Sequence, residues 1–159
     1  MKLLLMIMTL TFTAATAFAV DFRWTSGWAQ GTAEANIANG NGSSFNIFCP
    51  QWQTDTTPGM FIEVKRITTR QPNELVTVQI IVDGENHSFF LKQIEFKAVT
   101  ETDKSQFREL IRALASSKQK SFVVEFPKYN TAETFSLLDA RKALGLGKHS
   151  ILKGCDKGE

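Results

Sequence analysis

One stretch of the chain decides the fold: residues 75–92 read LVTVQIIVDGENHSFFLK. In its first half nearly every second side chain is a β-branched apolar one, and such period-two alternation predicts a strand with one buried face. The Asp83-Gly84 pair that follows is typical of a two-residue hairpin turn, because both residues tolerate positive φ. Residues 87–92 are therefore the expected antiparallel partner.

The same alternation recurs on both sides of this hairpin. It is clear at residues 60–65, and an Asn-Gly-Asn-Gly turn at residues 39–42 separates two earlier candidates. The remaining expected strands are residues 22–28, 32–38, 45–49, 94–99, 122–126 and 132–137.

Two segments have helical character instead. In residues 103–117 the apolar side chains recur at i, i+3, i+4 and i+7 from Phe107, which predicts an amphipathic helix with Asp103 as its cap. Residues 138–145 are expected to form a short helix that the following glycine ends. The sequence therefore predicts a mainly β protein of the α+β class: an antiparallel β-sandwich-like domain with an amphipathic helix packed on a sheet.

Residues 1–19 have the features of a cleavable signal peptide. A lysine, an apolar run and an Ala-Phe-Ala pattern follow one another, so cleavage is expected before Val20. A transmembrane anchor is the alternative, but a spanning helix needs about 20 predominantly apolar residues and this run is shorter. Residues 20–159 are expected to form a single bacterial periplasmic or secreted domain, with no membrane insertion after cleavage.

The net charge of the chain is small. It is formally +2 at pH 7, and without Lys2 the expected mature chain carries 17 basic and 16 acidic residues. Nucleic acids and anionic membranes bind to concentrated basic surfaces. The composition therefore argues against both as partners.

Two cysteines, Cys49 and Cys155, are the only ones in the chain. In an exported protein a disulfide between them is the simplest expectation, because the compartment is oxidising. A metal-binding pair and a reactive thiol are the alternatives, and the chain has no Cys-x-x-Cys motif to support either. A bridge would hold the C-terminal segment against the sheet.

The order of these features resembles a known group of proteins. The chain has an early strand that ends in cysteine (FNIFC, residues 45–49), hairpins, an amphipathic helix, FSL at residues 135–137, AL at residues 143–144 and the closing Cys155. It resembles small periplasmic proteins of the invasion-associated locus B type and is similar in layout to the VasI-like accessory proteins of type VI secretion. The resemblance implies a β-sandwich-like fold with a helix, a Cys49–Cys155 bridge and an envelope role without known catalysis.

No catalytic motif is evident. A set of Ser88, His87 and Asp83 can be written, but such sets arise by chance and no Gly-x-Ser-x-Gly motif frames a serine. Both His87 and His149 are expected at the surface, and neither has metal-ligand spacing with a cysteine. We expect no enzymatic activity, no metal and no cofactor.

Three tryptophans lie early in the chain, among polar residues: Trp24, Trp28 and Trp52. Trp24 and Trp28 are four residues apart, so on a strand they share a face. At least one is expected in the core, because aromatic side chains dominate small cores. The alternative is a surface that binds a protein or a glycan, since tryptophan is enriched in binding hot spots.

Three hypotheses for function follow. The first is a non-enzymatic exported protein that binds another protein, as an accessory of a secretion system or as an invasion-associated factor. The second is a periplasmic inhibitor or immunity protein against a toxin or lysozyme-like enzyme. The third is a hydrolase with an unrecognised site.

Overall fold

The computed structural model describes residues 21–50, 57–65, 74–148 and 150–155. Four features discussed above lie outside these described residues: the expected signal peptide, its cleavage site before Val20, Trp52 and His149.

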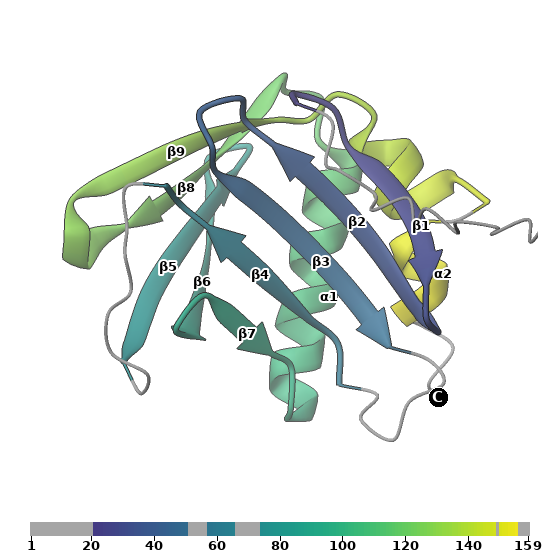
Figure 1. Cartoon of the computed structure of the whole chain (residues 1–159), viewed down its shortest axis with the longest axis horizontal. Coiled ribbons are helices and arrows are strands. Elements are labelled where there is room, and N and C mark those ends of the chain that lie inside the picture. The colour runs from purple at the N-terminus through teal and green to yellow at the C-terminus, as the bar shows by residue number, and fades with distance from the viewer. Residues whose placement is uncertain (1–20, 51–56, 66–73, 149, 156–159) are drawn as a thin grey trace, which may run out of the picture.

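Within the described residues, nine strands form one sheet (Figure 1). They are β1 (Thr25–Ala29), β2 (Thr32–Ala38), β3 (Ser44–Pro50), β4 (Gly59–Glu63), β5 (Leu75–Val82), β6 (Glu85–Lys92), β7 (Glu95–Lys97), β8 (Ser121–Phe126) and β9 (Thr131–Ser136). Across the sheet the order is β1-β2-β3-β4-β7-β6-β5-β8-β9, and each neighbouring pair is antiparallel. The predicted fold class, antiparallel α+β with mainly β structure, is confirmed.

The hairpin that decides the fold forms as expected. β5 pairs with β6 along its whole length, with Val82 opposite Glu85. The two turn residues, Asp83 and Gly84, have φ values of 53° and 83°. Positive φ at both positions is the geometry that suits the twist of a two-residue hairpin.

Helices cover one face of this sheet. In Figure 1, α1 (Glu101–Ser116) lies behind β2 and β3, and α2 (Ile151–Cys155) packs against these two strands near the end of the chain. The other helical segments are the 3₁₀ turn η1 (Pro127–Tyr129) and the π-helix η2 (Arg141–Leu146), which packs on α1. The layer opposite the strands is therefore helical, and the sandwich-like arrangement consists of one sheet and these helices.

The start of α1 differs from the expectation. The cap is Thr100, not Asp103, because the Thr100 hydroxyl oxygen accepts a hydrogen bond from the Asp103 backbone N–H at 3.1 Å. The Asp103 carboxylate in turn accepts from the Thr100 N–H at 2.9 Å. Asp103 is thus the reciprocal member of a capping box. The helix begins two residues earlier than its apolar period alone indicates.

Two remote contacts hold the ends of the sheet together. Asn39, in the turn between β2 and β3, donates from Nδ2 to the Glu133 carboxylate on β9 at 2.8 Å. Trp24 Nε1 donates to the carbonyl oxygen of Ser136, also on β9, at 3.0 Å. Since β2 and β9 stand far apart in strand order, these bonds require a strongly curved sheet.

A disulfide joins Cys49 to Cys155, as expected from the export prediction. Cys49 is buried at the end of β3, and the bond ties α2 to that strand across a sequence separation of 106 residues. The bridge therefore holds the C-terminal helix on the same face of the sheet as α1.

Candidate functional site

The two tryptophans within the described residues, Trp24 and Trp28, do not share a surface. Trp24 is buried, at 2% exposure, and its ring contacts Phe45 and Phe122 in the core. Trp28 is 41% exposed on the edge strand β1 and stands opposite the buried Ala33, so it faces the helical side of the sheet. Trp52 is outside the described residues. Trp24 is thus unavailable as a surface contact, and a binding role for the others stays a prediction.

The face of the sheet opposite the helices carries large apolar side chains that the sequence analysis does not predict there. In Figure 1 this face is turned towards the viewer at β2, β3 and β4, and no helix or strand of the described residues covers it there. Four large apolar side chains alternate with buried neighbours and point to this open face from β3, β4, β5 and β6: Phe48, Phe61, Leu75 and Phe90. Leu75 and Phe90 are 66% and 68% exposed. We call this the open face.

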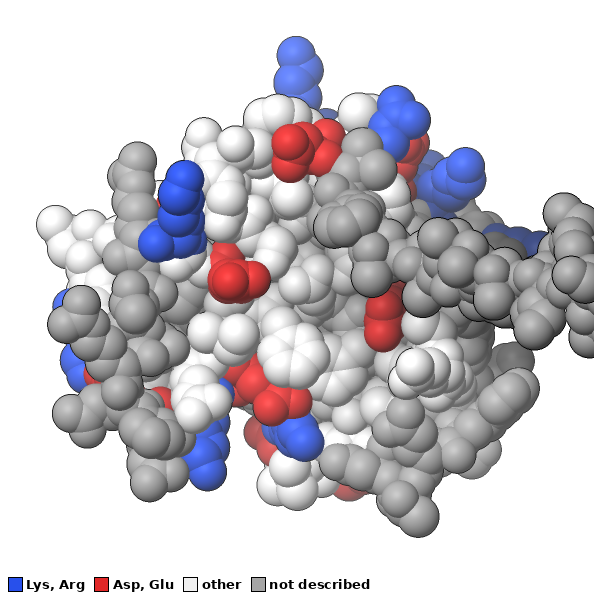
Figure 2. Space-filling view, in the orientation of Figure 1, with Lys and Arg blue, Asp and Glu red and all other residues white. Residues whose placement is uncertain are grey.

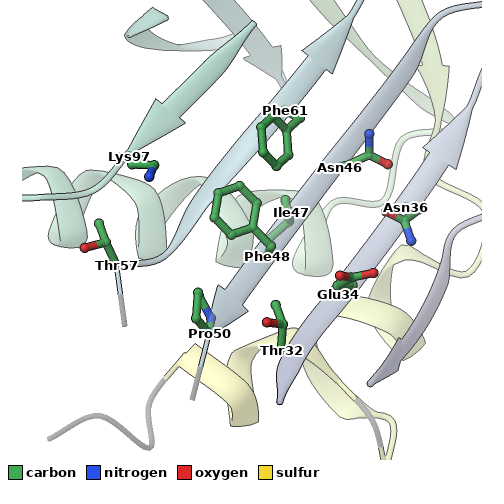
Figure 3. Close-up of a pocket in the computed structure, with 10 residues that line it drawn as sticks. All are labelled: Thr32, Glu34, Asn36, Asn46, Ile47, Phe48, Pro50, Thr57, Phe61 and Lys97. Atoms are coloured by element: carbon green, nitrogen blue, oxygen red, sulfur yellow. The ribbon is translucent and has the colours of Figure 1, made fainter. Parts of the chain in front are cut away.

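The centre of the open face is an aromatic pair. The rings of Phe48 and Phe61 stack with centroids 4.8 Å apart and planes 28° from parallel. Figure 3 shows the two rings side by side over β3 and β4. Offset stacking of this kind is a favoured geometry for two aromatic rings, which fixes the pair in place.

Gly59 makes room for this pair. It stands opposite Phe48 in the β3–β4 register, and a Cβ at this position would lie 2.6 Å from Cζ of Phe48 and 2.2 Å from the Phe96 carbonyl oxygen on β7, so the glycine also allows β7 to approach β4. The Phe48 ring therefore lies across the glycine backbone of the next strand. The aromatic pair is therefore held in place by the backbones of β3 and β4.

Polar side chains surround the aromatic pair. They line a groove of about 380 Å³ over β2, β3, β4 and β7. Its polar lining residues are Thr32, Glu34, Asn36, Asn46, Thr57 and Lys97. In Figure 3, Lys97 and Thr57 stand on one side of the rings, and Glu34 and Asn36 on the other. An apolar centre with a hydrogen-bonding rim is the usual arrangement of a binding surface.

The charge on this face is mixed. Figure 2 shows isolated acidic and basic side chains on a largely uncharged surface, with no broad area of one sign among the atoms that are not grey. Lys97 lies 3.8 Å from the Glu95 carboxylate, and both side chains are partly exposed. A mixed surface does not steer a strongly charged ligand from a distance. Recognition at the open face must therefore rest on local contacts.

A second polar cluster lies away from this groove. The Glu74 carboxylate accepts hydrogen bonds from Lys128 Nζ and, at 3.2 Å, from the Tyr129 hydroxyl. The bond from Lys128 is the main reason that the pKa of Glu74 is lowered, and the same bond raises the pKa of Lys128. Burial is the main reason that the pKa of Tyr129 is raised. These are the shifts of an ion pair that anchors η1 beside β5.

The residues of the chance catalytic set do not come together. Ser88 and His87 are consecutive on β6, so their side chains point to opposite faces of the sheet. The Ser88 hydroxyl donates to Asn86, and Asp83 accepts from Ser117 instead of from a histidine. His87 is only partly exposed, and its Nε2 is buried without a hydrogen-bond partner. The nucleophile, base and orienting acid of a hydrolase triad are thus not assembled from this set.

The sequence contains a signal for the open face, although this signal is not a motif. In each alternating strand the polar positions point away from the core, and Phe48, Phe61 and Phe90 occupy such positions. In an alternating strand, the positions that point to solvent are normally polar, so folding alone does not explain an aromatic residue there. The alternation of each strand therefore indicates, from sequence, that these three aromatic side chains point away from the core.

Fold and groove together define a class of protein: a curved antiparallel sheet that carries helices on one face and a groove with an aromatic centre on the other. The YfjT family model matches residues 22–144, which is most of the chain, and the protein belongs to the YfjT family. No curated protein and no solved structure matches it. Among the described residues, none of the helices has the length and apolar character needed to cross a membrane.

Proposed function

We propose that this protein is a non-enzymatic, exported bacterial protein that binds another protein through the open face of its sheet. One observation carries the proposal: the stacked Phe48–Phe61 pair at the centre of an uncovered sheet face. Protein-binding surfaces concentrate their energy in a few packed anchors, with a polar rim that excludes water. The aromatic pair and its surrounding amide, hydroxyl and charged side chains have this composition.

The surface around the groove supports the same function. Leu75 and Phe90 extend the apolar area along β5 and β6, where they stand as diagonal neighbours because Leu75 pairs with Lys92 and Thr77 pairs with Phe90. Grouped exposed apolar side chains mark interaction sites more often than single ones do. A protein partner is large enough to cover both the groove and this extension.

Export is the second part of the proposal. The signal-peptide pattern of residues 1–19 directs the chain out of the cytoplasm, and the Cys49–Cys155 disulfide is of the kind that persists in an oxidising compartment. A periplasmic or secreted accessory of a secretion system, or an invasion-associated factor, fits both features. The partner is then an envelope or secreted protein.

A photo-crosslinking experiment in the producing bacterium tests the proposal. A photoreactive phenylalanine analogue replaces Phe90, which is 68% exposed on the open face, and in a matched control replaces Leu146, which is 63% exposed on η2. We expect the probe at residue 90 to capture a defined protein that the probe at residue 146 does not capture.

The identity of the captured protein separates the hypotheses. A secretion or envelope component supports the accessory role, whereas a toxin or lysozyme-like enzyme indicates an inhibitor or immunity protein. Equal capture of many proteins from both positions, or capture from neither, would contradict protein binding by the open face.

A further inference from the structure

We infer that the protein bound at the open face is a second copy of this chain, packed face to face over β2, β3, β4 and β7. The inference rests on the proposed function, since it names the partner of the same surface. Its basis is the distribution of charge and hydrogen-bonding groups across the groove, which is complementary to itself.

The first line of evidence is a row of four residues that stand directly opposite one another on adjacent strands. Glu34 on β2 pairs with Phe48 on β3, Phe48 with Gly59 on β4, and Gly59 with Lys97 on β7. Neighbouring strands are about 4.8 Å apart, so the row spans about 14 Å from a carboxylate at one end to an ammonium at the other. The Phe48 ring lies over Gly59, at the middle of the row.

A second row runs beside the first. Asn36 on β2 pairs with Asn46 on β3, Asn46 with Phe61 on β4, and Phe61 with Glu95 on β7. This row has an amide at one end and a carboxylate at the other. In each row, the group at the β2 end can form an ion pair or a hydrogen bond with the group at the β7 end. An aromatic ring lies between the two ends of each row.

A two-fold axis brings these ends together. In a symmetric dimer, residue i of one copy meets residue j of the other and the reverse contact also forms. An axis that runs between β3 and β4, parallel to them, exchanges β2 with β7. It places Glu34 of each copy over Lys97 of the other, and Asn36 of each copy over Glu95 of the other. Every charged contact therefore occurs twice.

The contacts are compatible with the chemistry of the groups. Stacked sheets pack about 10 Å apart, a gap that a lysine and a glutamate side chain span together. The ammonium group of Lys97 has three donors, so its approach to Glu95 at 3.8 Å within one copy is compatible with a second carboxylate. Figure 3 shows Phe61 and Phe48 between Lys97 on one side and Glu34 on the other. The second copy supplies the second sheet of a β-sandwich.

Sedimentation of the purified, disulfide-bonded mature protein tests the inference by charge exchange. We expect a concentration-dependent dimer. Lys97→Glu and Glu34→Lys each place like charges opposite each other, and each raises the dissociation constant about tenfold or more. The double variant restores opposite charges and returns the constant to within about threefold of the original.

The controls keep the result specific. Glu109→Lys combined with Lys118→Glu exchanges the same charges at exposed positions on α1 and in the segment that follows it, and leaves the constant unchanged. Circular dichroism and thermal melting confirm that each variant folds. Phe48→Ser, which removes the central ring, weakens the dimer by more than about tenfold and provides a readout that does not depend on charge.

Two outcomes would overturn the inference: a monomer at every concentration, or a double variant that associates no better than the single ones. A monomer that still yields a different crosslinked protein at residue 90 contradicts self-association and leaves the proposed function standing. Failure of both experiments contradicts both. A crosslink only to the same chain supports the second copy as the partner.

Discussion

The hydrogen bond between Asn39 and Glu133 makes a strong prediction about stability, because it joins distant parts of the curved sheet. Both side chains are buried, at 3% and 7% exposure. Asn39 also accepts hydrogen bonds through Oδ1 from the N–H groups of Asn41 and Ser43, at 3.0 and 3.2 Å. One amide therefore closes the β2–β3 turn and holds it against β9.

The change Asn39→Ala removes all three bonds. A hydrogen bond to a charged group contributes about 1.5–3 kcal/mol, and a buried N–H left without an acceptor, as at Ser43, costs about 1–3 kcal/mol. We therefore expect the free energy of unfolding to fall by about 4 kcal/mol at pH 7. Urea unfolding followed by tryptophan fluorescence, to which the buried Trp24 contributes, measures this loss.

A double-mutant cycle separates the bond to Glu133 from the turn. We expect Asn39→Ala and Glu133→Ala to have a coupling energy of about 1.5–3 kcal/mol, because the two groups are in direct contact. A coupling energy below about 0.5 kcal/mol would refute the claim that this bond holds the sheet in its curved form.

Three further predictions concern the elements that support the open face. Replacing Cys49 and Cys155 together by Ala lowers the free energy of unfolding by up to about 4.8 kcal/mol, which is the loop-closure entropy calculated for a separation of 106 residues. An unchanged urea midpoint contradicts a stabilising bridge. Asp103→Ala costs about 0.3–1 kcal/mol at pH 7, because a carboxylate in the first turn stabilises the helix by about this amount. The backbone hydrogen bond from Thr100 lowers the pKa of Asp103 below its ordinary 3.8. The loss of stability caused by Asp103→Ala is therefore present above about pH 4 and disappears as the pH falls through the lowered pKa. A loss of the same size at pH 2 is inconsistent with the capping box. Gly59→Ala places a Cβ 2.2 Å from the Phe96 carbonyl oxygen and 2.6 Å from Cζ of Phe48, so both the β7 backbone and the ring must shift. The cost is about 1–3 kcal/mol or more in chemical unfolding, and an Ala variant as stable as the original argues against these close contacts.

Local pattern was enough to locate most of the strands. The bounds of β5, β8 and β9 agree with the alternation within one or two residues, because alternation and turn chemistry are properties of neighbouring residues. The order of the strands is different in kind. That β7 stands between β4 and β6, and that Asn39 meets Glu133 across 94 positions, depends on long-range packing that no local period encodes.

The helical segments show the same division. The apolar period located α1, but the cap at Thr100 depended on a reciprocal pair of hydrogen bonds that a period does not reveal. A short helix is expected at residues 138–145, and residues 141–146 form a π-helix in which the Gly147 N–H bonds to the Lys142 carbonyl. A side chain at Gly147 would collide with that carbonyl, so the glycine has a structural reason that composition alone leaves open.

Selection for binding, as proposed above, would explain the aromatic pair of the open face. A sheet that packs helices on one face needs apolar residues on that face only, and polar residues suffice on the other. Phe48 and Phe61 are outside the buried core, and Gly59, a poor strand residue, is placed where the Phe48 ring must lie. An exposed aromatic residue costs solubility and gives folding little, whereas Gly59 is required by the fold, because a Cβ there would lie 2.2 Å from the Phe96 carbonyl oxygen on β7. The two rings, and not the glycine, are therefore the feature of this face that folding leaves unexplained, and contact with a partner is the explanation that we propose.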